Sequence, residues 1–150
     1  MSVAEKQTAP VSGSDLERRL QRLEDIEAIR NLFLEYGRLA DTKDWAGYSD
    51  LFVESGTFDS PHSVGTVTGT KEIRERLGSA YGDDPADAVH LFHNIEVYVD
   101  GDRATAKSIW TFMLPGGKDS PPQVLMSGKY SDVLVRTDAG WKFEIRRCRL

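Results

Sequence analysis

The sequence predicts an α+β fold with a curved, mostly antiparallel sheet wrapped around N-terminal helices. Apolar residues recur at helical spacing from about residue 15 to residue 40. Alternating strand patterns follow from residue 89 onward and are joined by short turns such as Asp100-Gly101. Helices that precede a run of antiparallel strands favour packing on one face of the sheet. We therefore expect a pocket between the concave face and the helices, where small ligands commonly bind.

The longest helical segment is predicted over residues 15–40, as one helix or as two. Its start, Ser14-Asp-Leu-Glu17, has the spacing of a capping box, in which the two end side chains bond each other's free backbone amides. The preceding residues 1–13 contain Ser, Pro and Gly and predict a disordered tail. With 150 residues in the chain, we expect one domain over residues 14–150.

Two shorter helices are expected next. Asp44 is a good cap for a helix over residues 44–52, because the apolar pattern begins immediately after it. Three aromatic residues of this segment would face inward: Trp45, Tyr48 and Phe52. A third helix is predicted from Thr70, with Thr68 or Thr70 itself as its cap.

The remaining segments are predicted to form the sheet. A first strand begins at Gly56 and is ended or bent by Pro61. The segment 115–122, which is rich in Pro and Gly, is expected to be a mobile loop between two hairpins. The four hairpin strands are predicted over residues 89–100, 103–114, 124–136 and 141–149.

Composition argues against several classes of function. The net charge of -5 and the pI of about 5.2 give a surface that repels phosphate backbones, so no nucleic-acid partner is expected. No apolar run approaches the ~20 residues that a membrane span needs, and the N-terminal segment lacks the apolar stretch of a signal peptide. Cys148 is the only cysteine, which excludes an internal disulfide and a cysteine metal cluster. A cytoplasmic location is expected.

Two short stretches carry the candidate chemistry. Residues 36–45 close the long helix and include Tyr36 and Asp41. Residues 90–94, His-Leu-Phe-His-Asn, open a strand much later in the chain. If the fold brings these stretches to one cavity, they supply a base, an acid and a phenol, which is enough to move a proton.

His90 is the candidate base, because a histidine with the ordinary pKa of ~6.5 can accept a proton near pH 7. Strand alternation puts it on one face with Phe92 and Asn94. The alternative is a core histidine bonded to a backbone carbonyl. His93 would point to the opposite face, and His62 belongs to a loop that we expect at the surface.

Asp41 and Tyr36 are the candidate partners of this base. Asp41 lies just past the expected helix end, so the following turn must direct its carboxylate toward His90, where it would fix the tautomer and stabilise the imidazolium. Otherwise it is a capping or loop aspartate. Tyr36 is either a donor to a substrate oxygen or an ordinary core aromatic.

Arg146 is the candidate group that would stabilise a developing anion or a leaving group. Simple alternation puts Phe143 and Ile145 on one strand face and Arg146 on the other. A bulge would exchange the faces, so Arg147 remains an alternative. A solvated basic strand end is the competing interpretation of both arginines.

Aromatic residues along the chain are core candidates, and some are expected to line a substrate pocket. The two histidines of residues 90–94 have no third ligand at useful spacing, so no metal site is predicted. The glycines form neither a phosphate loop nor a dinucleotide-binding fingerprint, and no cofactor is expected. The candidate pocket residues are Trp45, Phe52, Phe58, Phe92, Trp110 and Tyr130.

The whole pattern resembles the nuclear transport factor 2-like superfamily, and more narrowly its SnoaL-like and scytalone dehydratase-like branch. The match spans about residues 20 to 149. Each motif is weak alone, whereas their order and spacing together are fairly specific. The motifs are Asp25-Ile-Glu-Ala-Ile-Arg30, Tyr36, Asp41-Thr-Lys-Asp44-Trp45, His90-Leu-Phe-His-Asn94, Asp100-Gly-Asp-Arg-Ala104, Gly128-Lys-Tyr130 and Gly140-Trp-Lys-Phe143.

This resemblance implies a cone-shaped α+β barrel around a deep, mostly apolar pocket. Members of the branch include scytalone dehydratase, a bile-acid dehydratase and a hexachlorocyclohexane dehydrochlorinase. They use an Asp–His pair that would correspond to Asp41 and His90. The pocket tyrosine of the bile-acid enzyme corresponds to Tyr36, and the pocket arginine of the dehydrochlorinase falls near Arg146.

Two tyrosines of scytalone dehydratase fall on Ala40 and near Ser60, so that enzyme's own reaction is not expected. We predict a cofactor-independent lyase or isomerase acting on a small hydrophobic molecule, for example a cyclic one. The first alternative is a non-catalytic module that binds such a molecule in the same pocket. The second is an assembly domain. A homo-oligomer is expected because a curved sheet has an outer face to cover, and the resemblance suggests a dimer or trimer.

Overall fold

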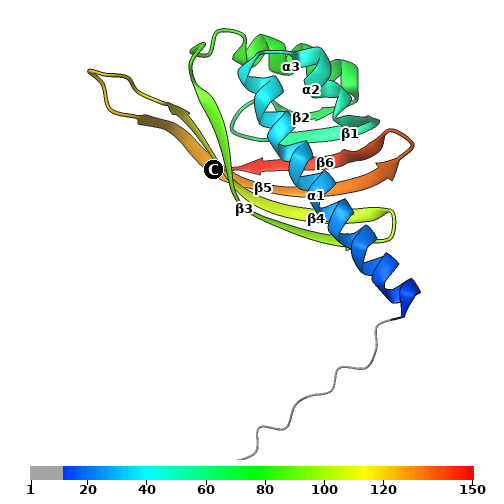
Figure 1. Cartoon of the computed structure of the whole chain (residues 1–150). Helices are drawn as coiled ribbons and strands as arrows, with labels where there is room; N and C mark the ends of the chain where they lie inside the picture. Colours follow the sequence, from blue (N-terminus) through cyan, green and yellow to red (C-terminus); the bar gives the residue numbers. More distant parts are fainter. Residues whose placement is uncertain (1–11) are drawn as a thin grey trace, which may run out of the picture.

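The computed structural model of the protein describes residues 12–150. The predicted tail falls mainly on residues 1–11, which lie outside the described part, whereas Ser12 and Gly13 cap and begin the first helix. Figure 1 shows the arrangement of the elements. In chain order they are α1 (Gly13–Asp41), α2 (Trp45–Asp50), β1 (Phe52–Ser60), β2 (Gly65–Thr68), α3 (Thr70–Tyr81), β3 (Val89–Asp100), β4 (Arg103–Leu114), β5 (Gln123–Thr137) and β6 (Gly140–Arg149).

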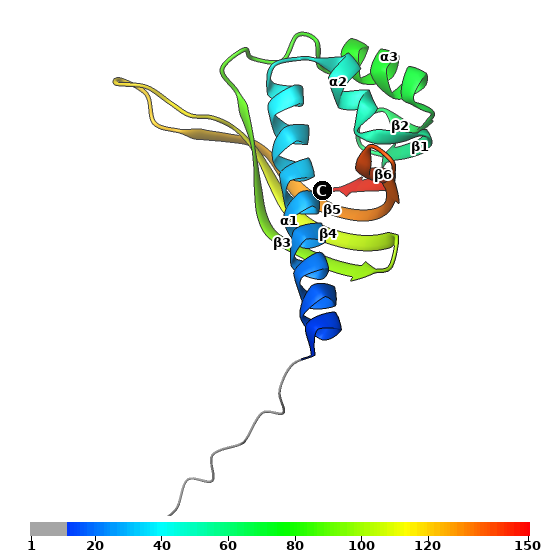
Figure 2. The same ribbon diagram turned by 45° about the vertical axis from the view of Figure 1, so that its right-hand side comes forward.

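The six strands form one sheet in the order β2-β1-β6-β5-β4-β3. Every neighbouring pair is antiparallel except β1 and β6, which are parallel. The sheet curves around α1, which crosses its concave face and contacts β3 and β6, while α2 and α3 cover the β1–β2 end (Figures 1 and 2). The predicted α+β architecture is confirmed, with a curved sheet that stays open rather than closing into a barrel.

Helix α1 begins earlier than predicted and uses a different cap. The hydroxyl of Ser12 accepts the backbone N–H of Asp15 at 3.2 Å, so the expected capping box at residues 14–17 is wrong. The second half of the helix buries an apolar stripe that includes Ile29 and Phe33 against the sheet. The first turns extend past the sheet edge (Figure 1). Three leucines of the predicted apolar stripe are therefore 54–64% exposed: Leu16, Leu20 and Leu23.

The chain between α1 and β3 departs most from the prediction. Asp44 caps α2 as expected, because its carboxylate accepts the N–H of Gly47 at 2.9 Å. Phe52 already belongs to β1, which pairs with the unpredicted strand β2. Four residues are too few to show alternation in a sequence. The expected threonine cap of α3 is wrong: its N-cap is Gly69, with a φ of 92° and no side-chain cap bond.

The four long strands match their predicted ranges to within one residue, but two irregularities change which faces they present. In β3 the pairing shifts between His93 and Glu96, and Asn94 between them adopts a φ of 50°. In the β5–β6 pair the register shifts next to Phe143. Phe143 and Arg146 are consequently both buried on the inner face, whereas Arg147 is only half-buried.

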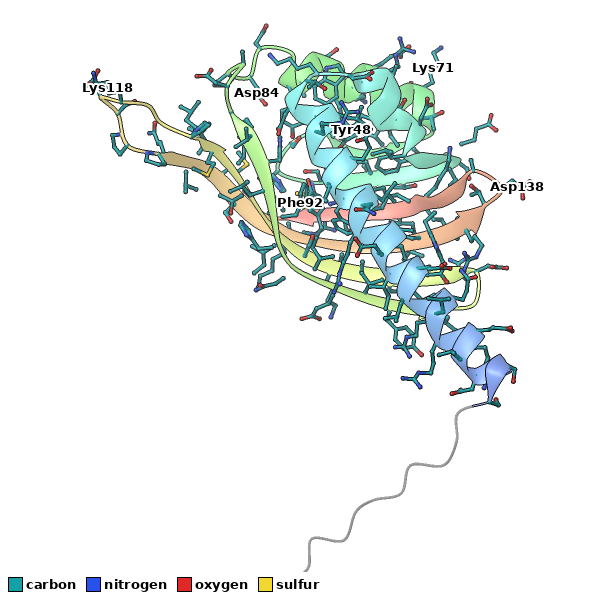
Figure 3. All side chains as sticks on the ribbon, viewed as in Figure 1. Tyr48, Lys71, Asp84, Phe92, Lys118 and Asp138 are labelled. Carbon is teal, nitrogen blue, oxygen red and sulfur yellow. The ribbon has the colours of Figure 1, made fainter. Side chains whose placement is uncertain are left out.

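The β4–β5 hairpin extends beyond the rest of the sheet (Figure 1). Its tip carries Lys118, as Figure 3 shows, and a short bridge between Gly117 and Ser120 closes the turn. The expected mobility of this loop stays a prediction.

Within residues 12–150, no helix is long and apolar enough to cross a membrane.

Candidate active site

A cavity of about 120 Å³ opens between the concave face of the sheet, the end of α1, helices α2 and α3, and the loop 82–88. Seven of the ten residues predicted from the sequence line it: Tyr36, Asp41, Trp45, Phe58, His90, Trp110 and Tyr130. The other three, Phe52, Phe92 and Arg146, do not line it and belong to the packed core around it.

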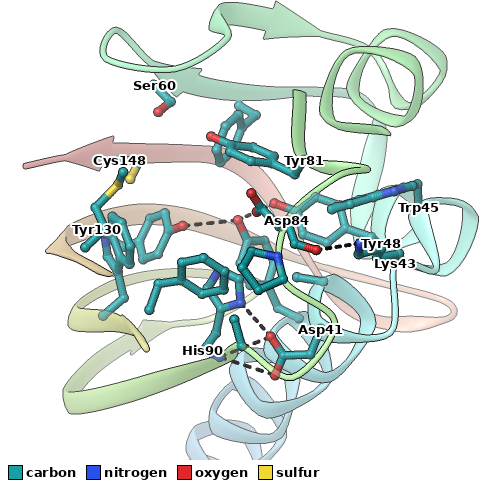
Figure 4. Close-up of a pocket in the computed structure, with 18 of the residues that line it drawn as sticks. Asp41, Lys43, Trp45, Tyr48, Ser60, Tyr81, Asp84, His90, Tyr130 and Cys148 are labelled. Atoms are coloured by element: carbon teal, nitrogen blue, oxygen red, sulfur yellow. Dashed lines mark hydrogen bonds and ion pairs between the residues drawn. The ribbon is translucent and has the colours of Figure 1, made fainter. Parts of the chain in front are cut away.

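Asp41 and His90 meet at one end of this cavity (Figure 4). The Nδ1 atom of His90 lies 2.6 Å from Oδ1 of Asp41. The backbone N–H of His90 donates to the same carboxylate, at 3.0 Å from Oδ1 and 3.2 Å from Oδ2. Because a carboxylate accepts hydrogen bonds, the proton belongs on Nδ1, and Nε2 is left as the acceptor. Imidazole with a free Nε2 is the form that a general base requires.

The turn after α1 holds Asp41 in this position. Asp41 is the last helical residue, and Lys43 takes a φ of 58°, which reverses the chain into α2. The ammonium group of Lys43 donates to the backbone carbonyls of Gly82 at 2.7 Å and Asp84 at 2.8 Å. This side chain therefore ties the loop before β3 to the end of α1, so that both halves of the Asp41–His90 pair share one anchor.

Three buried tyrosines form a second group of the cavity wall. The hydroxyl of Tyr48 donates to that of Tyr36, which lies 3.3 Å from the hydroxyl of Tyr130. Burial raises the pKa of Tyr36, and it raises the pKa of Tyr48 and Tyr130 well above the usual value, while the positive charge of Arg146 opposes the rise. The phenols are therefore neutral near pH 7 and can donate hydrogen bonds.

Arg146 lies behind these tyrosines, outside the cavity. Its side chain is 0% exposed and forms an ion pair with Asp132, with Nη1 of the arginine 3.4 Å from Oδ2 of the aspartate. The guanidinium carbon lies 3.7 Å from the ring centroid of Tyr130 and 4.0 Å from that of Tyr36. Burial raises the pKa of Asp132 to about 7, and the nearby Arg146 opposes that rise.

The cavity is also lined by polar residues that the sequence did not mark as site residues. Burial raises the pKa of the Asp84 carboxyl in the loop before β3. At the other end, Nε2 of His62 lies 3.3 Å from Oγ of Ser60 and 3.7 Å from Sγ of Cys148. His62 is exposed, as expected for its loop, yet it also borders the cavity. Nothing local in the sequence distinguishes Ser60, His62 and Cys148, because their meeting depends on how β1 and β6 pair.

Tyr48 was predicted only as an inward-facing aromatic, and its bond to Tyr36 was missed. His93 is exposed, consistent with its predicted position on the opposite strand face from His90. Among residues 12–150, no three His, Cys, Asp or Glu side chains gather closely enough to hold a metal ion.

Comparisons with known proteins find relatives of the same fold. An uncharacterized protein of Mycobacterium tuberculosis, Rv2910c, is 31% identical over 121 residues, which cover 79% of this chain and 80% of the relative. An NTF2-like protein with a cystatin-like fold from Novosphingobium aromaticivorans superposes with a TM-score of 0.79 at 28% identity, covering 93% of this chain and 90% of its own.

A second structure from Novosphingobium aromaticivorans, assigned by name to the scytalone dehydratases, has a TM-score of 0.71 at 25% identity and covers 85% of both chains. The family model described as the SnoaL-like domain matches residues 21–147, which include both members of the Asp–His pair and all three tyrosines. The chain therefore belongs to the SnoaL-like family.

Proposed function

We propose that the protein is a cofactor-independent lyase or isomerase that removes a proton from a small hydrophobic ring compound. The observation that carries this proposal is the 2.6 Å contact between His90 and Asp41 at the wall of a cavity. A core histidine bonded only to main-chain carbonyls would have no such carboxylate partner. Membership of a family that includes scytalone dehydratase-like relatives supports the same class of reaction.

The proposed reaction begins with Nε2 of His90. It takes a proton from the carbon next to a substrate carbonyl, and the electrons of the broken C–H bond move to the carbonyl oxygen as an enolate. Asp41 stabilises the resulting imidazolium, and a phenol of the tyrosine group donates a hydrogen bond to the enolate oxygen. Return of the proton to another carbon completes an isomerisation, whereas loss of a group from the β-carbon completes an elimination.

The size of the cavity suits a substrate of about one ring. Its volume of about 120 Å³ is close to that of engineered protein cavities of roughly 150 Å³ that hold a benzene molecule. Four residues contribute large apolar aromatic side chains to the wall: Trp45, Phe58, Trp110 and Phe112. A single ring with one oxygen substituent would match both the size and the chemistry.

Hydrogen–deuterium exchange tests the proton transfer without knowledge of the final product. The protein is incubated with cyclohexanone or cyclohexenone in heavy water, and mass spectrometry follows exchange at the carbon next to the carbonyl. We expect the His90→Gln variant to lose about 10²–10⁴-fold of the enzyme-dependent rate. His93→Gln, on the exposed face of the same strand, is the matched control and should exchange at the wild-type rate.

An unchanged rate in His90→Gln would overturn the mechanism. If the wild-type protein binds these ketones and exchanges none of their hydrogens, the alternative of a non-catalytic binding module holds instead. The expected dimer or trimer also stays a prediction, which sedimentation of the full-length protein would test.

A further inference from the structure

Helix α1 carries apolar residues on two opposite faces. One face packs against the sheet and buries Ile29, Phe33 and Tyr36. The other face is exposed, and six of its residues recur at alternating intervals of four and three. We call these six residues the outer seam: Leu16, Leu20, Leu23, Glu27, Arg30 and Leu34. At 3.6 residues per turn they fall within about 80° of one another around the helix axis, on the side away from the sheet.

The outer seam is more apolar than a solvated helix face needs to be. Its four leucines are 54–64% exposed. Single exposed leucines are common on protein surfaces, whereas a contiguous apolar patch marks an interaction site. Among the described residues, no element covers this side of α1, which lies over the concave face of the sheet (Figure 1). Alternating intervals of four and three are the heptad spacing of a helix that pairs with another helix.

The two charged residues of the outer seam have no ionic partner in their own subunit. Glu27 and Arg30 are both exposed, and neither forms an ion pair within residues 12–150. They carry opposite charges and lie three positions apart. A polar residue at a seam position costs stability in paired helices but specifies their register, because it must meet a suitable counterpart.

We propose that the outer seam binds the outer seam of a second copy of this chain, with the two α1 helices antiparallel about a two-fold axis between Ala28 and Ile29. In a two-fold interface residue i contacts residue j, and residue j contacts residue i. This register places Glu27 against Arg30 of the partner subunit, and it does so twice. It also places Leu23 against the partner's Leu34 at both ends of the contact.

The length of α1 fits this arrangement. The helix runs from Gly13 to Asp41 and contains 29 residues, which corresponds to a length of about 43 Å. The proposed axis lies close to its middle, so the two helices overlap over nearly their full length. Leu16 and Leu20 then lie over the last turns of the partner's helix, and all four leucines of each copy become covered.

Other pairings of the outer seam fit worse. A shift of the antiparallel register by one heptad in either direction places Arg30 opposite a leucine, which is Leu20 of the partner subunit in one direction and Leu34 of the partner subunit in the other. In a parallel pair, each seam residue faces its own copy, so Glu27 meets the partner's Glu27 and like charges repel. Of these arrangements, the proposed one alone joins charge to opposite charge and leucine to leucine.

This surface is separate from the cavity, because none of the six seam residues lines it. The inference therefore does not depend on the proposed function. It also differs from association through the outer face of the sheet, which is the surface that the sequence suggested for an oligomer.

Charge exchange tests the contact between Glu27 and Arg30. Sedimentation of the full-length protein at several concentrations gives the dissociation constant of the dimer. Glu27→Arg should raise this constant about 10- to 100-fold, because arginine then faces arginine twice, and Arg30→Glu should raise it similarly. The double variant Glu27→Arg/Arg30→Glu restores opposite charges and should dimerise as the wild-type protein does. Glu75→Arg on the exposed side of α3 changes the net charge equally and should have no effect.

Cysteine cross-linking tests the direction and register of the helices. Leu23→Cys/Leu34→Cys should form disulfide-linked dimers on oxidation, because the two cysteines face each other across the interface. Leu23→Cys alone should not, since its two copies lie about 11 residues, or about 16 Å, apart along the axis, and a disulfide spans roughly 4.4–6.8 Å between Cα atoms. The native Cys148 is buried, so the wild-type protein should not cross-link.

The substituted residues are all exposed, so each variant should keep its fold, and circular dichroism checks this. A wild-type protein that sediments as a monomer or a trimer would overturn the inference. A dissociation constant that is unchanged in Glu27→Arg, or that the double charge variant fails to restore, would overturn it as well. A disulfide in Leu23→Cys alone would show a parallel pair and would contradict the proposed register.

Discussion

The carboxylate of Asp41 contacts two groups of His90. Its Oδ1 atom lies 2.6 Å from the ring nitrogen Nδ1, and the same carboxylate accepts a hydrogen bond from the backbone N–H of His90. A single aspartate therefore sets both the position of the strand start and the orientation of the imidazole. The pair is partly buried, with side-chain exposures of 22% for Asp41 and 21% for His90. This double attachment leads to the first prediction.

Asp41→Asn should lower the exchange rate by about 10²–10⁴-fold while leaving the protein folded. The amide oxygen can still accept the backbone N–H of His90, but the amide NH₂ group can donate to Nδ1 and favour the tautomer with the proton on Nε2. That tautomer cannot accept a proton from the substrate. The exchange assay measures the rate and circular dichroism the fold; a folded variant with the wild-type rate would contradict the role of Asp41.

Asp132 makes stability depend on pH. Its folded-state pKa of about 7 lies above the ordinary value of 3.8 for an aspartate, so the native state binds the proton more tightly than the unfolded chain. The contribution of this proton to the free energy of unfolding is complete below about pH 4 and is lost as the pH rises to about 7. At 1.36 kcal/mol for each pKa unit, this loss is at most about 4 kcal/mol.

Urea unfolding across this pH range measures the effect. We expect the unfolding free energy of the wild-type protein, relative to that of Asp132→Asn, to fall as the pH rises. The asparagine variant has no proton to release at this position, so it cancels the contributions of all other titrating groups. Parallel pH profiles for the two proteins would contradict a raised pKa at Asp132.

Asp25 should be a major contributor to stability. It joins α1 to the β5–β6 hairpin, accepting two bonds from Arg136 at 2.7 and 2.8 Å and one from the indole of Trp141 at 3.1 Å. Hydrogen bonds to charged groups contribute about 1.5–3 kcal/mol each at most, and the bonds are not additive, so Asp25→Ala should cost about 3 kcal/mol. Chemical denaturation measures this cost.

Asp15→Ala provides the matched control for Asp25. Asp15 lies on the same helix and also pairs with an arginine, Arg18 at 3.1 Å, but both side chains are exposed. Its loss should cost less than about 1 kcal/mol. The hydrogen bond from Arg136 also lowers the pKa of Asp25, so its contribution is present above the unfolded pKa and is lost as the pH falls through the lower folded value. Equal costs for the two variants would contradict this assignment.

Gly128→Ala should disturb the cavity wall. A Cβ atom at this position would lie 2.3 Å from the backbone oxygen of Arg149 and 2.8 Å from Nε1 of Trp110, a cavity residue. Overpacking of this kind costs about 1–3 kcal/mol. Thermal unfolding should show the loss, and ligand binding should weaken as Trp110 moves. Gly117→Ala, whose Cβ would meet only Oγ of Ser120 at 3.8 Å, should change neither measurement.

Much of the fold was predictable because regular elements follow a local pattern. The predicted strands over residues 89–100 and 103–114 coincide with β3 and β4, since alternation repeats every second residue. Prediction was poorest where packing decides the structure. Strand β2 is too short to show a period, and the cap of α3 depends on the backbone of Gly69 rather than on a side chain.

The candidate site was likewise predictable only in part. Asp41, His90 and Tyr36 were identified from residue chemistry and a family resemblance, and the fold brings all three to one cavity. The cluster of buried tyrosines could not be predicted from the sequence. Tyr36 and Tyr130 are 94 positions apart, and their contact depends on the register of the sheet. The orientation of Arg146 was equally inaccessible, because one irregular pairing beside Phe143 determines which face it occupies.

By itself, the amino-acid order determined the succession of helices and strands and the kinds of reactive side chain, because both are properties of neighbouring residues. Only the tertiary structure decided which of those side chains meet, what lies behind them and how large a molecule fits between them. The physical reason is that hydrogen bonds and charge interactions act over a few ångströms in space, and folding alone brings residues from opposite ends of the chain within that range.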